Sequence, residues 1–326
     1  MRVLLPRFAR IGCVLVSVAF VFGLLGARWW LFDLCAHFRV QYGYALLVCA
    51  VLLTLFRDFR WSIPAWIAAV WISWPHALSL PDVDAAASVA AQDQPTFKVL
   101  TLNAWYRNHD TARVARYLAT SDADVILVQE FDGKRMRELV DALPSYPHAA
   151  LAAAADRRGA AILSRWPIES SQPLPLANAR RHAQWALVRW HSMPVQVVAV
   201  HLPWPLGPRV SRERNQQLRE LSQWMRQADG PVVVGGDFNL SPWSPHFDAA
   251  LELANARDAI GSRPGMSTWP TQFPPLGIQI DHCLISHEWQ VMRIARGPRV
   301  GSDHYPVLVE LRLDSPNATP RAPRGG

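Results

Sequence analysis

The sequence lacks the cysteines that a disulfide framework would need. Only Cys283 lies beyond the first 50 residues, because Cys13, Cys35 and Cys49 all lie in or beside apolar runs near the N-terminus. A disulfide-stabilised domain is therefore excluded for the part of the chain that follows residue 80. Cysteine usage does not identify the cellular compartment.

A strong charge of one sign is also missing from most of the chain. The net charge of +7 comes mainly from residues 1–80, which contain seven arginines and two aspartates, whereas residues 81–326 contain 26 basic and 24 acidic groups. Composition therefore does not require a basic nucleic-acid surface in the second part. The N-terminal arginines fit a membrane explanation better.

Three apolar runs at residues 11–27, 40–56 and 61–80 contain almost no charge, since His76 is their sole titratable side chain apart from cysteine and tyrosine. A helix that crosses a bilayer needs about 17–25 apolar residues. We therefore expect residues 1–80 to be a membrane anchor with three spanning helices, or two if prolines make the third run interfacial or re-entrant. A cleaved signal peptide is the alternative for the first run, but no convincing small-residue cleavage site follows it.

The arginines of this region also predict its orientation. Arg2, Arg7 and Arg10 favour a cytoplasmic N-terminus by the positive-inside rule. Three crossings would place the larger part of the chain outside the cytoplasm, and Arg57 and Arg60 would then lie in a cytoplasmic loop, as the rule requires. We expect an integral protein of the bacterial inner membrane in contact with the lipid bilayer, and no obligate protein partner is inferred.

The rest of the chain alternates short β-rich runs with helical runs. Residues 81–95 have no clear period and are predicted to be a linker, and residues 314–326, rich in Pro, Arg and Gly, are predicted to be disordered. Between them, strands are expected at 97–103, 125–129, 160–164, 185–190, 195–201, 232–235, 279–286 and 307–313, and helices at 111–120 and 210–227. This order predicts an α/β domain at 96–313, with two mixed sheets packed together and helices outside.

Polar side chains stand at the ends of several of these strands. Those that follow or flank a strand are Asn103, Glu130, His201, Asp237, Asn239 and Asp281, and Asp303 and His304 precede the last strand. Each one alone is typical of a solvated strand end or a turn. Together, carboxylates, imidazoles and amides at one sheet edge suit hard-metal binding and phosphate chemistry. Arg209, Arg212, Arg214 and Arg219, on the second helix, are instead expected mostly on a solvated face.

The order of these motifs resembles the endonuclease/exonuclease/phosphatase superfamily, which includes pancreatic-type DNases, abasic-site endonucleases and neutral sphingomyelinases. The matching stretches are KVLTLNAW (98–105), DVILVQEFD (124–132), RGAAILSRWPI (158–168), VVAVHLPWP (197–205), VVVGGDFNLSPWS (232–244), STWPT (267–271), IQIDHCLIS (278–286) and GSDHYPVLVEL (301–311). The resemblance implies a four-layered α/β sandwich with an active site at one edge.

The resemblance also implies a role for each matching residue. Asn103, Glu130 and Asp303 would bind or orient Mg²⁺, for which Mn²⁺ could substitute; His201, Asp237, Asn239, Asp281 and His304 would be catalytic; and Arg158, Asn239 and His201 would bind the substrate. Either Asp237 or His304 could be the general base. One or two metal ions are equally compatible with this set.

Two positions depart from the abasic-site branch of the superfamily. Trp105 stands where those enzymes have an acidic residue, and His201 stands where they have a tyrosine. The sequence therefore predicts a membrane-anchored, Mg²⁺-dependent hydrolase of phosphoester bonds, acting on nucleic acid or on a phospholipid headgroup. The alternative is a catalytically inactive membrane-bound binding module on the same fold.

Overall fold

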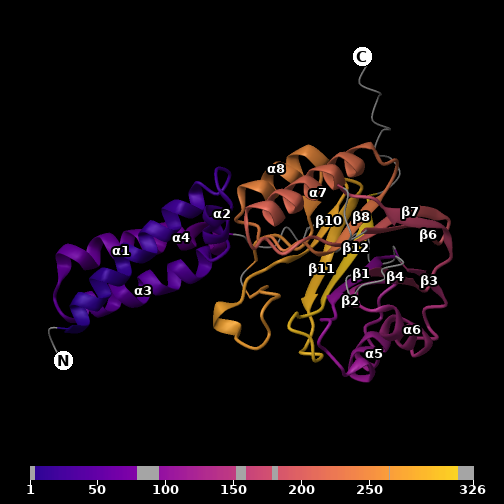
Figure 1. Ribbon diagram of the computed structural model, residues 1–326, viewed down its shortest axis with the longest axis horizontal. Helices are drawn as coiled ribbons and strands as arrows, with labels where there is room; N and C mark the ends of the chain where they lie inside the picture. Colours follow the sequence, from indigo (N-terminus) through magenta and orange to yellow (C-terminus); the bar gives the residue numbers. More distant parts are fainter. Residues whose placement is uncertain (1–3, 79–94, 152–158, 178–182, 264, 315–326) are drawn as a thin grey trace, which may run out of the picture.

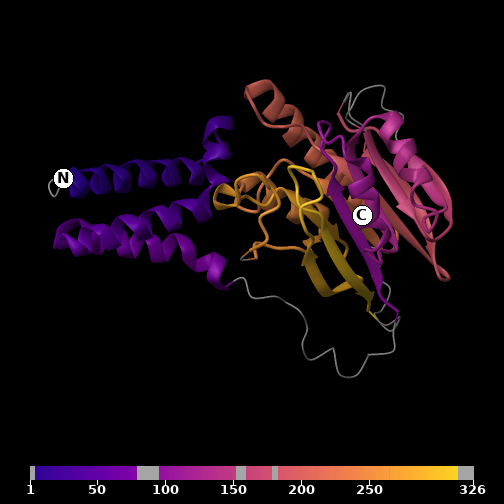
Figure 2. The same cartoon turned by 90° about the horizontal axis from the view of Figure 1, so that it is seen from below.

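Four helices precede the first strand of the chain. The computed structural model describes residues 4–78, 95–151, 159–177, 183–263 and 265–314, and it begins with α1 (Leu4–Leu24), α2 (Trp30–Ala36), α3 (Arg39–Leu55) and α4 (Phe59–Leu78). The three longer helices form a bundle at one end of the molecule (Figures 1 and 2). Leu46, Ala50 and Leu53 of α3 are completely buried in the core of this bundle.

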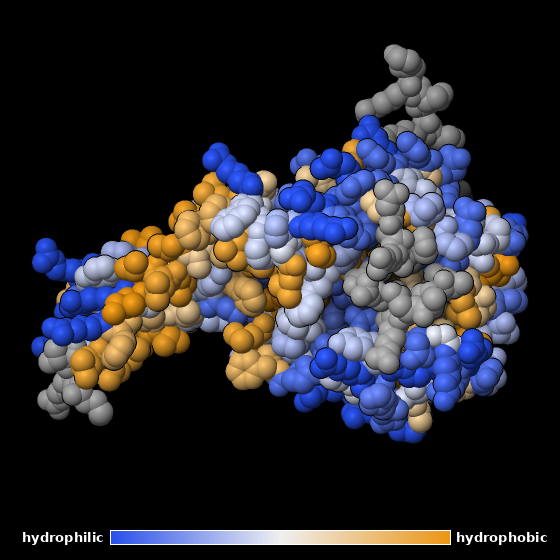
Figure 3. Space-filling view, in the orientation of Figure 1, coloured by the Kyte–Doolittle hydropathy of each residue, from blue (hydrophilic) through white to orange (hydrophobic). Residues whose placement is uncertain are grey.

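The three predicted apolar runs correspond to α1, α3 and α4. Among the described residues, α1 is the one single helix that is long and apolar enough to cross a bilayer, while α2 and α3 meet the same criteria together as a pair bent by 62°. Helix α4, which contains two prolines and four tryptophans, does not meet them. Figure 3 shows apolar side chains gathered over the bundle. The number of spans and their orientation stay predictions.

Two six-stranded sheets form the centre of the described chain after residue 95. The first sheet has the order β11 (Trp289–Arg296), β12 (Val307–Leu313), β1 (Phe97–Asn103), β2 (Val125–Phe131), β4 (Gly159–Ser164), β3 (His148–Leu151). The second has the order β5 (Ile168–Leu174), β6 (Ala183–Trp190), β7 (Met193–His201), β8 (Val232–Asp237), β10 (Asp281–Ile285), β9 (Arg257–Asp258). Both sheets are mixed, as the order of predicted elements indicated.

Helices cover the outer face of each sheet. α5 (Thr111–Ala119) and α6 (Gly133–Asp141) pack on the first sheet, whereas α7 (Pro208–Gln227) and α8 (Pro245–Ala254) pack on the second (Figure 1). A third apolar cluster, which contains Phe97, Val197 and Trp289, fills the space between the two sheets. A short 3₁₀ helix, η1 (Pro274–Leu276), precedes β10. This is the four-layered α/β sandwich that was predicted.

The central strands of both sheets are parallel pairs. β1 and β2 run in the same direction with Asn103 opposite Gln129, and β7 and β8 run in the same direction with His201 opposite Asp237. The antiparallel strand β10 begins with Asp281 opposite Asp237. Parallel neighbours end at the same edge of a sheet, so these registers place the polar strand ends together.

The sequence predicted the long elements better than the short ones. The expected helices at 111–120 and 210–227 correspond closely to α5 and α7, and the expected strands correspond to members of both sheets. Helices α6 and α8 and strands β3, β5 and β11 were not predicted. The predicted linker at 81–95 and the predicted tail at 314–326 lie outside the described residues, except for Pro95 and Asp314.

Candidate active site

The first sheet contributes Asn103 and Glu130. Asn103 ends β1, and its Nδ2 donates to Glu130 Oε1 and to Asp237 Oδ2, each at 3.0 Å. Glu130 lies in a β-bulge between Gln129 and Phe131 and has a left-handed φ of 68°. A bulge redirects a side chain that a regular strand would point elsewhere, and here the carboxylate turns toward the second sheet. Its Oε2 accepts the backbone N–H of Tyr106 at 3.1 Å.

The second sheet contributes His201 and Asp237 from the ends of its parallel pair. His201 Nε2 lies 3.4 Å from Glu130 Oε1 and 3.6 Å from Asp237 Oδ2. Gly236 precedes Asp237 at a φ of 151°, and a Cβ there would overlap the carbonyl of Val200. Glycine is therefore needed for β7 and β8 to approach closely beside the functional carboxylate.

Asn239 follows β8 in a left-handed conformation with a φ of 49°. Its backbone N–H donates to Asp237 Oδ1 at 2.8 Å, and its Nδ2 donates to the Leu202 carbonyl at 2.9 Å and to Asp237 Oδ2 at 3.2 Å. The amide side chain is thus fixed beside Asp237 by hydrogen bonds at both ends of the residue. Asparagine adopts this left-handed conformation more readily than other non-glycine residues do.

His304 and Asp281 form a buried pair. His304 Nδ1 lies 2.8 Å from Asp281 Oδ2, and its other ring nitrogen, Nε2, lies 3.7 Å from Asp237 Oδ2 and 4.0 Å from Asp303 Oδ1. Asp303 Oδ2 accepts the indole N–H of Trp269 at 3.1 Å. The arrangement of carboxylate, imidazole and second carboxylate is one that orients a histidine for proton transfer.

The ionisation of this cluster departs from that of isolated groups. Burial, together with the neighbouring carboxylates, raises the pKa of Asp237 to about 7 against the opposing effect of His304. Burial alone would lower the pKa of His304, but Asp281 and Asp237 outweigh it and raise that pKa to about 10. Burial and Glu130 raise the pKa of Asp303. For Glu130, His201 and the hydrogen bond from Asn103 outweigh burial and lower the pKa.

A divalent cation fits this donor set. One ligand atom from each of Glu130, His201 and Asp237 lies within 4.8 Å of the other two, and the Oδ1 of Asp303 is buried without a hydrogen-bond partner. Carboxylates crowded at low solvent exposure raise one another's pKa, and a cation between them would relieve that repulsion. The metal ligands predicted from the sequence were Asn103, Glu130 and Asp303. Of these three residues, Glu130 also belongs to the cluster of Glu130, His201 and Asp237.

All but one of the predicted site residues lie in a single network of contacts. Its members are Asn103, Glu130, His201, Asp237, Asn239, Asp281, Asp303 and His304. Arg158 lies outside the described residues. Their chemical roles stay predictions.

Two supporting residues were missed. Trp269 binds Asp303, and Ser302 donates its hydroxyl to the Asn103 carbonyl at 2.6 Å while accepting the His304 N–H. Trp269 lies in the motif STWPT and Ser302 in the motif GSDHYPVLVEL. Membership of these motifs is the sequence feature that could have indicated a role for them near the site.

The sequence matches a family model described as the Endonuclease/Exonuclease/phosphatase family over residues 100–304, which is more than half of the chain. A curated protein, UPF0294 protein VP2298 of Vibrio parahaemolyticus, is 26% identical over 248 residues, covering 71% of this chain and 83% of the other.

Solved structures of similar fold include two with the same family description. An endonuclease/exonuclease/phosphatase from Beutenbergia cavernae has a TM-score of 0.55 at 21% identity, covering 67% of this chain and 72% of its own. A family protein from Bacteroides thetaiotaomicron has a TM-score of 0.56 at 19% identity, covering 68% and 99%. TDP2 of D. rerio, solved with a single-strand DNA product, has a TM-score of 0.56 at 19% identity, covering 67% and 99%.

Proposed function

Because the chain belongs to the endonuclease/exonuclease/phosphatase family, we propose that it is a divalent-metal-dependent hydrolase of phosphoester bonds. The observation that carries this proposal is the single buried network in which two sheets bring together Glu130, Asp237 and the His304–Asp281 pair. Mg²⁺ or Mn²⁺, when bound near Glu130, would neutralise negative charge on the substrate phosphate.

Side chains of the protein would provide the proton transfers and the hydrogen bonds to the phosphate. Asp237, whose pKa is raised to about 7, can accept a proton from the attacking water near neutral pH. His304, whose pKa is raised to about 10, is protonated and donates to a phosphate oxygen, with Asp281 holding its ring. Asn239 contacts the same phosphate by exchanging the hydrogen bond that its Nδ2 donates to Asp237 for one to a phosphate oxygen. His201 donates to the leaving oxygen. Hydrogen bonds aimed at developing charge are a large source of rate acceleration.

We propose further that the N-terminal helices anchor this hydrolase to a membrane. α1 has the length and composition of a span. Arg10 Nε pairs with Asp58 Oδ2 at 2.6 Å, so the N-terminal part of α1 lies beside the turn that contains Arg57 and beside the start of α4, which contains Arg60. This end of the bundle is opposite the sheets (Figure 1). The positive-inside rule then favours a catalytic domain outside the cytoplasm. A reporter fused at residue 95 that is active only as a cytoplasmic enzyme would contradict this orientation.

The substrate is proposed to be nucleic acid or a phospholipid headgroup. D. rerio TDP2, a structure of the same fold, is described in complex with a single-strand DNA product. The nearly balanced charge of residues 81–326 and the apolar bundle favour a lipid substrate instead. Both substrates present the same phosphodiester to the site, so an assay has to distinguish them.

The test is a substrate panel on the full-length protein in detergent, with and without Mg²⁺ or Mn²⁺. It should contain bis-p-nitrophenyl phosphate, DNA, RNA, sphingomyelin and phosphatidylinositol phosphates. We expect metal-dependent turnover of the chromogenic diester, and loss of that turnover in Glu130→Gln. Absence of turnover on every substrate, together with no binding of Mg²⁺ or Mn²⁺, would refute the hydrolase and favour the inactive binding module.

A further inference from the structure

Residues 239–244, in the loop between β8 and α8, are held by contacts from two parts of the molecule. Within the sandwich, Arg214 Nη1 donates to the Asn239 carbonyl at 3.2 Å, and His282 Nε2 lies 2.8 Å from the Leu240 carbonyl. From the N-terminal helices, His37 Nδ1 lies 2.9 Å from Ser241 Oγ, and Asp33 Oδ1 accepts the Ser244 hydroxyl at 2.5 Å. This loop begins with a residue of the candidate active site, so its supports affect that site.

Asp33 is connected to both ends of the loop. Its Oδ1 binds Ser244, which caps the N-terminus of α8, and its Oδ2 accepts Arg214 Nη2 at 2.5 Å. Arg214 in turn holds the carbonyl of Asn239. The exposed fractions of Asp33, Arg214 and Ser244 are 2%, 0% and 0%. A buried guanidinium whose counter-charge is removed is left uncompensated, which is strongly destabilising.

The helix that carries Asp33 is closely packed against the sandwich. Asp33 and His37 are four residues apart, and such a spacing places side chains on one face of a helix. A Cβ on Gly26 would lie 3.2 Å from Pro245 and 3.1 Å from the Cα of Asp33, so the segment before α2 packs closely against the start of α8. Figures 1 and 2 show α2 at the end of the bundle that faces the sandwich.

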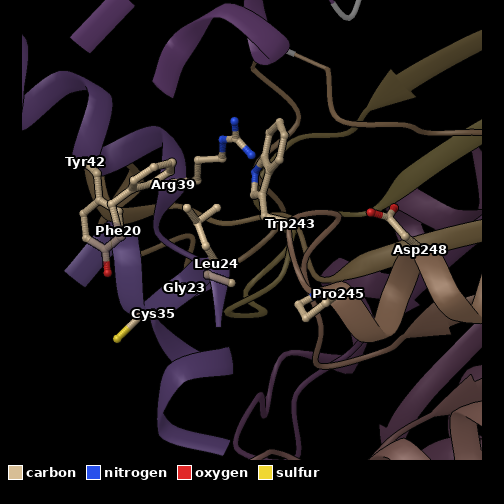
Figure 4. A pocket seen from close by; sticks show the side chains of 10 residues that line it. Phe20, Gly23, Leu24, Cys35, Arg39, Tyr42, Trp243, Pro245 and Asp248 are labelled. Carbon is tan, nitrogen blue, oxygen red and sulfur yellow. The ribbon is translucent and has the colours of Figure 1, made fainter. Parts of the chain in front are cut away.

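A small cavity of about 160 Å³ adjoins this contact. Figure 4 shows Arg39, Phe20 and Leu24 from the helices on one side and Trp243 and Pro245 from the loop region on the other. The Arg39 guanidinium lies 4.9 Å from the centre of the Trp243 ring and 5.6 Å from that of Phe20. The N-terminal helices therefore contact this loop through several side chains, and Asp33 is connected to both of its ends, directly at Ser244 and through Arg214 at Asn239.

We propose that Asp33 is a positioning residue for the active site, acting through Arg214 and Ser244 to hold Asn239 in its functional conformation. Asn239 has a left-handed φ of 49°, and the hydrogen bond from Arg214 to its carbonyl fixes the orientation of the peptide group at this position. The N-terminal helices are then a working part of the catalytic unit as well as its proposed anchor. The kinetic part of this inference rests on the proposed hydrolase function.

The test compares two substitutions in the full-length protein. Asp33→Asn removes the buried charge, and Asp58→Asn removes a carboxylate of the same bundle that pairs with the half-exposed Arg10 at the far end. We expect Asp33→Asn to lower kcat for bis-p-nitrophenyl phosphate about tenfold to a hundredfold with little change in KM, because small displacements of a catalytic group have costs of this order. Asp58→Asn should match the unmodified protein.

Hydrogen exchange gives a second readout that needs no enzymatic activity. We expect amides of residues 238–246 to lose protection in Asp33→Asn while those of β1 and β2 keep it. Unchanged kcat and unchanged protection of this loop would overturn the inference. If the unmodified protein hydrolyses nothing, the proposed function fails, and the exchange result alone decides the role of Asp33.

A milder variant covers the case in which Asp33→Asn does not fold. Ser244→Ala keeps the ion pair between Asp33 and Arg214 but removes one of the two contacts of the carboxylate. We expect a loss of kcat of about threefold to tenfold, which is the range for one ordinary hydrogen bond, with local loss of protection at residues 241–246. Wild-type kcat together with wild-type exchange in this variant would equally overturn the inference.

Discussion

The two sheets contribute to the candidate active site in similar ways but are supported differently. Each ends a central parallel pair at the site, with Asn103 and Glu130 on the first sheet and His201 and Asp237 on the second. The helices over the first sheet, α5 and α6, pack against that sheet in a cluster of their own. The helices over the second, α7 and α8, also contact the N-terminal bundle through Arg214 and Ser244.

This difference indicates which part of the site depends on contacts with the N-terminal helices. The first half depends on strand geometry, chiefly the bulge at Glu130, which belongs to a strand buried on both sides. The second half includes the loop at Asn239, whose conformation depends on contacts from a distant segment of the chain. Substitutions where the N-terminal helices contact α7 and α8 should therefore affect the part of the site on the second sheet and leave the part on the first sheet unaltered.

Metal removal should have the largest effect, because the cation would lie where both halves meet. We expect EDTA to abolish phosphodiester hydrolysis and added Mg²⁺ or Mn²⁺ to restore it. A cation at about 100 times its Kd should also stabilise the folded protein by about 2.7 kcal/mol, which a thermal unfolding assay would detect. Full activity after exhaustive chelation would mean that the two halves do not share a metal.

Neutralising one carboxylate from each half should be nearly as damaging. Glu130→Gln and Asp237→Asn preserve shape but remove charge, and we expect each to lower kcat/KM about 10³-fold, as loss of a main transition-state contact does. Glu138→Gln, on the exposed face of α6, is the matched control. If only one of the two substitutions reduced turnover, the two sheets would not contribute equally.

The sequence predicted which side chains lie together at the candidate site because their motifs are local. Runs such as GGDFN and SDHYPV put polar groups at strand ends, and parallel pairing then brings those ends together. The bulge that gives Glu130 a φ of 68° has no such local signal, and neither does the hydrogen bond from Trp269 to Asp303. Both depend on contacts between segments that lie far apart in the chain.

Arg214 shows the limit of this reasoning most clearly. With Arg209, Arg212 and Arg219 it was expected mostly on a solvated face, and those three are exposed while Arg214 is completely buried. Its counter-charge, Asp33, precedes it by 181 residues and lies between two predicted spans. Helical spacing alone cannot reveal a partner on another layer of the fold.

Removing the partner of His304 should have an intermediate effect. Asp281→Asn keeps the hydrogen-bonding shape but removes the charge that orients the imidazole and raises its pKa. We expect kcat to fall about 10²-fold, the lower range for general acid–base catalysis. Metal-induced thermal stabilisation should persist here, unlike in Glu130→Gln. Loss of both properties together would show that Asp281 belongs to the metal site.

The smallest expected effects compare the two outer helix layers directly. Leu118→Ala on α5 and Leu221→Ala on α7 each remove a buried leucine, so each should cost about 2–5 kcal/mol of unfolding free energy, measured by chemical denaturation. Leu221 lies seven residues after Arg214, on the same face of α7. We expect Leu221→Ala also to lower kcat a few fold by displacing Arg214, while Leu118→Ala leaves kcat unaltered. Equal kcat values in the two variants would show that the second half is no more dependent on its covering helices than the first.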